Sequence, residues 1–311
     1  MAGNSSPIVS YVATVYNKRP YLDELFESIA EQGVRPAEVV FSDDGSSDGS
    51  LDFLESIAET RREPDLSIRV CRSTSNQGPS RAINVGIAAS TGTWVHCVDG
   101  DDVLPRNTTA SFIEVAERTG VDFIYGQKIA LEASGGEQLS HIDYRVYPDA
   151  LAALIKLRLV GMRFFCSRGL ANAGADERVF IQDVSLAYRV AYHAHSLAVL
   201  NQPVVRIRDA ANSVSKGRKQ EHADFIGAAA LFLSDFDVPR GVRNKILQRC
   251  FARMRKHGDW SAVPWEVLAV GGLFPNRPNE RILRAFLRLN AEHNLRRGCR
   301  FDEIRALTSE P

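Results

Sequence analysis

The chain has 311 residues, of which 44% are hydrophobic and 24% charged, so it can bury a large core and has the composition of a soluble globular protein. Lysine plus arginine and aspartate plus glutamate number 38 each, and this balance argues against nucleic acid as a partner. The five cysteines form no CxxC pair, no apolar run approaches the ~20 residues that cross a bilayer, and the N-terminus does not resemble a signal peptide. We therefore expect a cytoplasmic protein with reduced thiols.

Strand and helix patterns alternate through the first 130 residues. The nearly all-apolar run at 8–15 predicts a buried strand, and Pro20 opens a segment, 21–32, whose apolar residues have helical spacing. This alternation predicts βαβ units and a Rossmann-like, mostly parallel sheet flanked by helices. The further predicted strands are 37–42, 66–72, 93–98 and 121–127, and the further predicted helices are 50–62, 79–90 and 106–120.

The pattern is less regular from residue 128 onward and becomes helical after residue 218. Glycines 135 and 136 interrupt the segment 128–147, which we interpret as a hairpin or an excursion. We place a boundary near residue 218, with an α/β domain at 1–218 and a helical C-terminal extension at 219–311. The last 72 residues are basic, with 15 Lys/Arg against 7 Asp/Glu. The remaining predicted elements are helices at 148–161 and 180–194, a short strand at 162–167 and two short strands within 197–209.

Two acidic stretches begin where predicted strands end. Asp43 and Asp44 follow the second strand, and Asp99, Asp101 and Asp102 follow the fourth. Open parallel sheets bind ligands beyond the carboxyl ends of their strands, so both stretches are placed for a ligand. Three carboxylates within four residues repel one another, and Mn²⁺ or Mg²⁺ would relieve this repulsion because hard cations take oxygen ligands. Such a metal also binds phosphates, which suits transfer from a nucleotide-activated donor.

The acidic stretches also fit two other interpretations. The spacing from Asp44 to Glu55 approaches that of a calcium loop, but a strand enters it instead of a helix, and Asp48 fits a helix cap. The run after the fourth strand also fits the D-x-D-x-V start of a haloacid-dehalogenase-type phosphatase, with Asp99 as nucleophile and Asp101 as acid/base. Three strand–helix units precede it, whereas that motif normally lies on the first strand. This phosphatase and a non-catalytic sugar-nucleotide-binding module remain the alternatives.

Three segments together resemble family 2 glycosyltransferases, which have the GT-A fold. They are "VATVYNKRPYLDELFESIAEQ", "EVVFSDDGSSDGS" and "NQGPSRAINVGIAASTGTWVHCVDGDD", the last of which ends in a D-x-D signature. The resemblance covers about the first 215 residues. It implies a metal-dependent, inverting transferase of the hexosyltransferase type that uses a nucleotide-sugar, first of all a UDP-sugar. Without a "QxxRW" run we expect a non-processive enzyme.

The resemblance also implies roles for individual residues. The first-strand end lies along the nucleotide base, Asp43 accepts a hydrogen bond from the base, and Asp44 lies beside the ribose. Asp99, Asp101 and Asp102 hold Mn²⁺ or Mg²⁺ and the ribose or diphosphate. Asp209 stands where a metal-binding histidine is common and could replace it. The residues expected to bind the nucleotide are Thr14, Val15, Tyr16, Asp43, Asp44, Arg81, Asn84, Asp99, Gly100 and Asp101.

The segment "GADERVFIQDVSLAYRV" resembles the part of the family that carries the catalytic base. Asp183 matches the aspartate that deprotonates the acceptor hydroxyl, and Gln182 stands where glutamate is more common. A helix cap is the alternative role for Asp183. The acceptor is a glycan, a lipid-linked molecule or a protein, in surface polysaccharide or glycoconjugate biosynthesis. For the basic extension we expect an acceptor-side role, a homo-oligomer interface or peripheral contact with the cytoplasmic face of a membrane.

Overall fold

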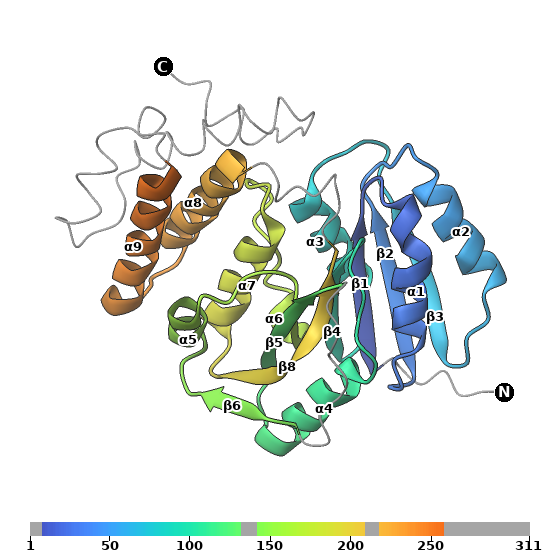
Figure 1. Cartoon of the computed structure of the whole chain (residues 1–311), viewed down its shortest axis with the longest axis horizontal. Coiled ribbons are helices and arrows are strands. Elements are labelled where there is room, and N and C mark those ends of the chain that lie inside the picture. Colours follow the sequence, from blue (N-terminus) through green and yellow to red (C-terminus); the bar gives the residue numbers. More distant parts are fainter. Residues whose placement is uncertain (1–7, 132–141, 209–217, 258–311) are drawn as a thin grey trace.

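The computed structural model describes residues 8–131, 142–208 and 218–257, and these form a mixed α/β fold around one sheet of eight strands (Figure 1). The strand order is β3-β2-β1-β4-β7-β5-β8-β6. The sheet is mostly parallel, and only β7 and β6 run antiparallel to their neighbours. This is the Rossmann-like, mostly parallel sheet that the alternation of strands and helices predicted.

The first half of the chain forms the predicted βαβ units. Register in the sheet places Val15 opposite Asp43 and Thr14 opposite Asp99, so the carboxyl ends of three strands meet at one edge. The strands are β1 (Val9–Val15), β2 (Ala37–Asp43), β3 (Leu66–Arg72) and β4 (Trp94–Asp99), and the helices are η1 (Arg19–Tyr21), α1 (Leu22–Ala30), α2 (Ser50–Thr60), α3 (Pro79–Ala89) and α4 (Thr108–Thr119).

The second half differs from prediction at β8 and at the short helix Arg168–Ala171, which was not predicted. The segment expected as two short strands is one strand, β8, whose register against β5 shifts near Pro203. The segment 128–147, expected as a hairpin or an excursion, ends in β6, which pairs with β8, and residues 132–141 lie outside the described part. The elements are β5 (Phe123–Ala130), β6 (Tyr144–Tyr147), α5 (Ala150–Leu157), β7 (Phe164–Ser167), α6 (Arg168–Ala171), α7 (Gln182–His193) and β8 (Leu197–Ile207).

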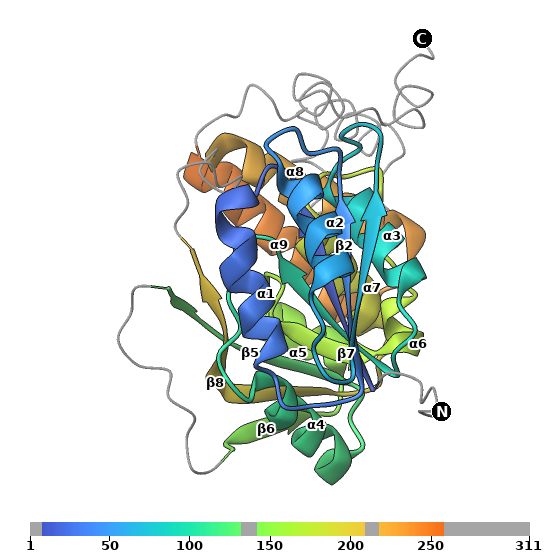
Figure 2. The same cartoon turned by 90° about the vertical axis from the view of Figure 1, so that its right-hand side faces the viewer.

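A hydrophobic cluster lies on each face of the sheet. Figure 2 shows α1 on one side of the strands and α3 on the other. Tyr11, Phe26 and Phe112 belong to the cluster under α1, α2 and α4. Ile83 and Tyr188 belong to the opposite cluster, under α3, α5 and α7. Alternate residues of a strand contribute to the two clusters, because successive side chains of a strand point to opposite faces of the sheet.

Two further helices, α8 (Arg218–Asp235) and α9 (Arg240–His257), pack beside α7 and α5 (Figure 1). Phe225 and Ile246 from these helices join the cluster that contains Tyr188. The boundary predicted near residue 218 coincides with the start of α8, and the division into two domains stays a prediction. Residues 258–311 lie outside the described part.

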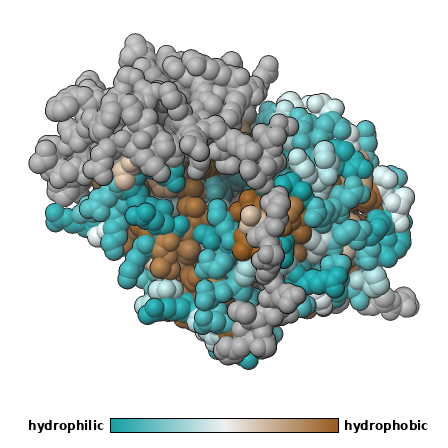
Figure 3. All heavy atoms as spheres, viewed as in Figure 1, coloured by the Kyte–Doolittle hydropathy of each residue, from teal (hydrophilic) through white to brown (hydrophobic). Residues whose placement is uncertain are grey.

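Within the described ranges, no helix is both long and apolar enough to cross a membrane. The face of the molecule seen in Figure 3 is largely hydrophilic where it is coloured, with smaller hydrophobic areas between the polar side chains.

Candidate active site at the carboxyl ends of the strands

Asp43 ends β2 with one carboxylate oxygen engaged and the other free. Its Oδ1 accepts hydrogen bonds from the backbone N–H groups of Gly45 and Ser46, both at 3.0 Å. Its Oδ2 is buried and has no hydrogen-bond partner. A buried acceptor without a partner costs free energy, so Oδ2 is placed to receive a hydrogen bond from a ligand.

Asp44 has the opposite arrangement, because both of its oxygens are occupied by the protein. Oδ1 accepts from the N–H of Gln77 and Oδ2 from the N–H of Gly78, each at 2.8 Å. Burial raises the pKa of this carboxyl in spite of these hydrogen bonds. Asp44 therefore joins the loop after β2 to the loop after β3. Gly45 permits this approach, since its φ is +77° and a Cβ there would lie 2.7 Å from the backbone carbon of Ser75.

The loop after β1 contributes a cation that the sequence analysis missed. Lys18 forms an ion pair with Asp101, and its backbone N–H donates to Ser50 Oγ at 3.0 Å. Asn17, at φ 52°, donates its N–H to Ser46 Oγ at 2.9 Å, so this loop is tied to the one after β2. The only signal for Lys18 in the sequence was the acidic cluster itself, which requires positive charge nearby.

Gly100 lets the end of β1 approach residues 99–102, the acidic loop at the end of β4. A Cβ at this position would lie 2.6 Å from the carbonyl oxygen of Thr14 and 3.3 Å from Cγ of Lys18. Val15 lies on the same side, and its carbonyl accepts the N–H of Asp44 at 2.8 Å. Tyr16 follows Val15 directly, with 45% of its surface exposed.

Lys18 does not offset the effect of burial and mutual repulsion on the carboxyl groups of residues 99–102. Burial raises the pKa of Asp99 well above its usual range, and the neighbouring carboxylates of Asp102, Asp101 and Asp183 add to this. Burial and then Asp101 raise the pKa of Asp102 to about 7. A cation at this loop would relieve the repulsion.

The described residues contain no group of three or more His, Cys, Asp or Glu side chains arranged to hold a metal. The oxygen donors of Asp99, Asp101 and Asp102 nevertheless fit Mg²⁺ or Mn²⁺. Mg²⁺ in particular usually binds through one or two carboxylates and takes its other ligands from water and phosphate. The site therefore fits a metal that arrives with a phosphate-bearing ligand.

Asp183 lies at the start of α7, close enough to the acidic loop to raise the pKa of Asp99. Its Oδ1 accepts the N–H of Val184 at 2.8 Å. The preceding residue, Gln182, donates from Nε2 to Asp99 Oδ1 at 3.2 Å. An ionised glutamate could not make that donation, so the contact gives a physical reason for the glutamine at position 182.

Asn84 and Arg81 lie on α3 and face the loop that precedes α7. The Asn84 side chain donates to Ala175 O and to Glu177 Oε1, both at 2.9 Å, and accepts the N–H of Ala175 at 2.7 Å. Arg81 is paired with Glu177 at 3.1 Å, and its charge only partly offsets the burial that raises the pKa of Asp44. The hydrogen bonds described for Asn84 all go to the protein, which points to a role in holding this loop.

Asp209 lies outside the described residues, whereas the structure describes the residues immediately before it, up to Arg208. Arg208 donates from Nε to the carbonyl of Asp101 at 3.3 Å. Arg206 and Val103 exchange backbone hydrogen bonds of 3.1 and 2.8 Å. The end of β8 therefore lies against the acidic loop, and Asp209 is the next residue along the chain.

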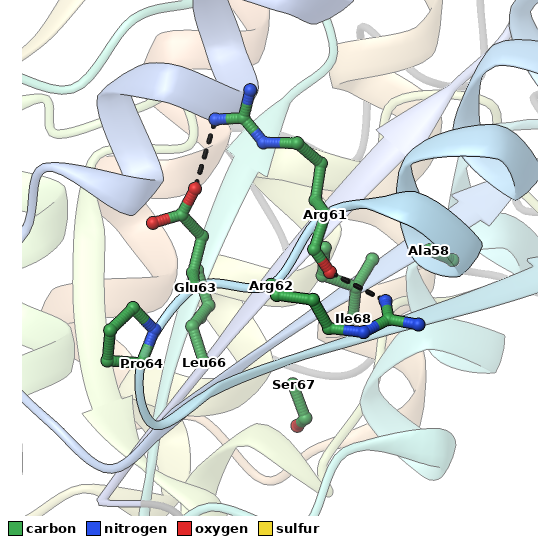
Figure 4. Close-up of a pocket in the computed structure, with 8 residues that line it drawn as sticks. All are labelled: Ala58, Arg61, Arg62, Glu63, Pro64, Leu66, Ser67 and Ile68. Atoms are coloured by element: carbon green, nitrogen blue, oxygen red, sulfur yellow. Dashed lines mark hydrogen bonds and ion pairs between the residues drawn. The ribbon is translucent and has the colours of Figure 1, made fainter.

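A separate hollow of about 370 Å³ lies away from these carboxylates (Figure 4). It is formed at the end of α2 and the start of β3, which is the amino end of the parallel strands. The side chain of Arg61 is paired with Glu63 at 3.0 Å, and that of Arg62 donates to the carbonyl of Arg61 at 2.8 Å. No residue predicted for the active site lines it.

Residues 10–179, more than half of the chain, match the model of the family described as Glycosyl transferase family 2. The chain belongs to this family. Among its relatives, the glycosyltransferase EpsJ of Bacillus subtilis is 34% identical over 118 residues, which are 38% of this chain and 33% of EpsJ. The succinoglycan biosynthesis protein ExoO of Rhizobium meliloti is 31% identical over 155 residues, which are 49% of this chain and 41% of ExoO. The match thus spans only about a third to two fifths of these relatives.

Solved structures resemble this family 2 chain in fold. Residues 1–349 of S. aureus TarS, in complex with UDP-GlcNAc, have a TM-score of 0.65 at 17% identity, covering 93% of this chain and 92% of that one. The mannosyltransferase PcManGT from Pyrobaculum calidifontis, in complex with GDP-Man and Mn²⁺, has a TM-score of 0.61 at 20% identity, covering 98% and 84%. Membership in family 2 favours glycosyl transfer over both alternatives, the phosphatase with Asp99 as nucleophile and the non-catalytic module.

Proposed function

We propose that this chain transfers a hexose from a nucleotide-sugar to an acceptor hydroxyl, with a divalent metal and inversion at the anomeric carbon. The observation that carries the proposal is that three acidic groups lie close together. Asp43 ends β2, the acidic loop follows β4, and Asp183 lies at the start of α7, where its charge acts on Asp99. Family membership supports it, and the complexes of TarS with UDP-GlcNAc and of PcManGT with GDP-Man and Mn²⁺ are consistent with it.

The nucleotide is proposed to lie across the ends of β1 and β2. Thr14, Val15 and Tyr16 would flank the base, and Asp43 Oδ2 would accept a hydrogen bond from a base N–H. Uracil offers such a donor, so UDP-sugars are the first choice, with GDP- and dTDP-sugars behind them. Asp44, with both oxygens occupied, would shape the ribose pocket through the loops it joins.

Asp99, Asp101 and Asp102 would hold Mn²⁺ or Mg²⁺ together with the diphosphate. The bound metal would supply Lewis-acid stabilisation of the charge that develops on the leaving diphosphate. Lys18, paired with Asp101, adds a fixed positive charge at the same place. Asp209 is proposed as a further ligand.

Asp183 is proposed as the general base. It takes the proton of the acceptor hydroxyl, and the acceptor oxygen forms a bond to the anomeric carbon from the face opposite the diphosphate. The bond between the anomeric carbon and the diphosphate oxygen breaks, and the nucleoside diphosphate leaves with that electron pair. This single displacement inverts the configuration. Gln182 holds the start of α7 against Asp99 and so fixes the distance between the base and the donor.

The acceptor is proposed to be a glycan or a lipid- or protein-linked molecule in surface polysaccharide or glycoconjugate biosynthesis, in keeping with the relative ExoO. The helices after residue 218 would shape the acceptor side. Homo-oligomerisation through this extension and peripheral contact of its basic part with a membrane remain proposals as well.

Nucleotide binding should depend on the metal, since carboxylates and diphosphate repel each other without it. At 100 times its dissociation constant, UDP should stabilise the fold by about 2.7 kcal/mol, which raises the melting temperature of a chain of this length by about 4 °C. The rise is expected with Mn²⁺ or Mg²⁺ and lost in EDTA or in Asp101→Ala. A panel of nucleotide-sugars measured with Mn²⁺ identifies the donor. Equal stabilisation by UDP in EDTA would show that the metal has no part in binding.

A further inference from the structure

The loop at 174–181 leads into α7, and its residues 175–179 all form hydrogen bonds or ion pairs with side chains. Three anchors come from α3 and α7, and they hold the loop close to the sheet. They are the hydrogen bonds of Asn84 with Ala175, of Ser185 Oγ with the N–H of Asp176 at 2.6 Å, and of Ser80 Oγ with the carbonyl of Val179 at 2.6 Å. Since Gln182 and Asp183 follow directly, the loop decides where these two side chains lie.

Arg178, a residue of the loop, connects the loop to α8. Its guanidinium donates to Asp176 from Nε at 2.9 Å and from Nη2 at 2.6 Å, which fixes the guanidinium on the loop. The same Nη2 forms an ion pair with Asp235, the last residue of α8. The side chains of Arg178 and Asp176 are 25% and 10% exposed, so water screens their contact less than it would a surface ion pair, whereas Asp235 reaches Arg178 from an exposed position.

The end of α8 is seated on α7 by packing as well. The ring of Phe236 lies 4.6 Å from that of Tyr192 and 5.1 Å from the guanidinium carbon of Arg189, measured to ring centroids. Arg189 in turn donates from Nε to the carbonyl of Ala173 at 3.0 Å, next to the loop. A carboxylate at the C-terminal end of a helix is disfavoured by the helix dipole. Asp235 occupies that place, and Arg178 is its ion-pair partner within the described residues.

We infer that Arg178 and Asp235 are positioning residues, through which α8 sets the place of the proposed base Asp183. The inference rests on the proposed function for its consequence in catalysis. The chain of contacts runs from Asp235 to Arg178, to the loop, and on to Gln182 and its hydrogen bond with Asp99. A displacement of ~1 Å at a reacting group can cost 10²-fold in rate, so a modest loosening of the loop is measurable.

The test compares Asp235→Ala with Asp235→Glu as the conservative rescue and Asp237→Ala as the control. Asp237 lies two residues away and is exposed, and its described contact uses only its backbone carbonyl. In Asp235→Ala we expect faster hydrogen exchange confined to the amides of 175–184, with kcat lowered about tenfold and the donor KM within about twofold of wild type. Asp235→Glu should recover most of the loss, and Asp237→Ala should behave as wild type.

Wild-type exchange and kcat in Asp235→Ala would overturn the inference, and so would exchange that rises over the whole chain. If Asp235→Ala does not fold, Arg178→Gln, which keeps a donor for Asp176 but loses the charge, tests the same link with the same expected and contradicting results. A wild-type protein that transfers no sugar from any donor in the panel would overturn the proposed function instead, and the exchange measurement would still decide whether α8 holds the loop.

Discussion

The carboxylates of the site differ in the hydrogen bonds and charges that surround them, and these differences separate their roles. Asp43 keeps one buried oxygen free, whereas its neighbour Asp44 has both oxygens occupied by backbone N–H groups. Asp101 is paired with Lys18, while Asp99 accepts a hydrogen bond from Gln182. Adjacent aspartates in the sequence therefore supply a free buried acceptor, a structural link and the loop for which we propose metal binding.

Asp183→Asn separates the role of a base from that of a helix cap. The asparagine keeps the shape and can still accept the N–H of Val184, but it cannot take a proton. A general base contributes typically 10²–10⁴-fold, so transfer should fall by about that factor while UDP-sugar binding and stability stay nearly unchanged. Steady-state rates, donor titration and thermal unfolding of the same variant provide the measurements.

Near-normal transfer by Asp183→Asn would remove this residue from the mechanism, because asparagine caps helices about as well as aspartate. The proton acceptor would then have to be sought among Asp176, Glu177 and Asp209. Asp176 and Glu177 are already engaged by Arg178 and by Arg81 and Asn84.

At the level of elements, the site depends on the close approach of the ends of β1 and β4. Gly100→Ala would place a Cβ 2.6 Å from the carbonyl oxygen of Thr14, a backbone atom that cannot rotate away. We expect the free energy of unfolding in urea to fall by about 1–3 kcal/mol, as for other overpacked sites, and metal-dependent UDP binding to weaken.

Gly33→Ala is the matched control for Gly100→Ala, since nothing lies within 4 Å of a Cβ at Gly33. It should change the free energy of unfolding by no more than about 0.5 kcal/mol. Equal stability of the two variants would mean that β1 and the acidic loop are further apart than the structure has them.

The strands and helices of the first half were predictable because their signals are local. Apolar runs and helical spacing mark β1 to β5 and α1 to α4 without knowledge of the fold. In β8, by contrast, the polar Asn201-Gln202-Pro203 suggested a break between two strands. Pro203 is accommodated at a shift of register against Gln127, where the missing N–H of proline is tolerated, so one strand continues through it.

The same distinction applies to the site. The aspartates at strand ends were predictable from their place in the pattern, and the family resemblance assigned Asp183. The contacts of Lys18, Gln182 and Arg208 with the aspartates were not predictable, because the partners are far apart in the sequence. Lys18 is 83 residues from Asp101, Gln182 is 83 residues from Asp99, and Arg208 is 107 residues from Asp101. Such pairs follow from the order of the strands, which a single sequence does not reveal.

For the whole molecule, stability depends on the two hydrophobic cores on the faces of the sheet. The cluster under α1, α2 and α4 surrounds His96, which is fully buried and has no hydrogen-bond partner at either ring nitrogen. Its ring contacts are Tyr11, Phe112 and Phe165, at centroid distances of 5.8, 5.3 and 6.0 Å. The hydroxyl of Tyr11 is 2.8 Å from that of Thr109, and burial raises the pKa of Tyr11 to about 12, so its ring stays neutral beside His96.

His96 should make the free energy of unfolding fall as the pH is lowered. Burial lowers its pKa from 6.5 to about 3, so between these values the unfolded chain binds a proton that the native protein does not. Stability then rises with pH in this window, with a slope of up to ~1.4 kcal/mol per pH unit from this residue.

His96→Phe, which also removes two buried polar atoms without partners, should flatten the urea-unfolding profile between pH 6.5 and 4.5 and stabilise the fold near pH 5. His195→Gln, at an exposed position, is the control and should keep the wild-type slope. An unchanged slope in His96→Phe would mean that His96 is protonated in the native protein, and the acid sensitivity would then arise from other groups.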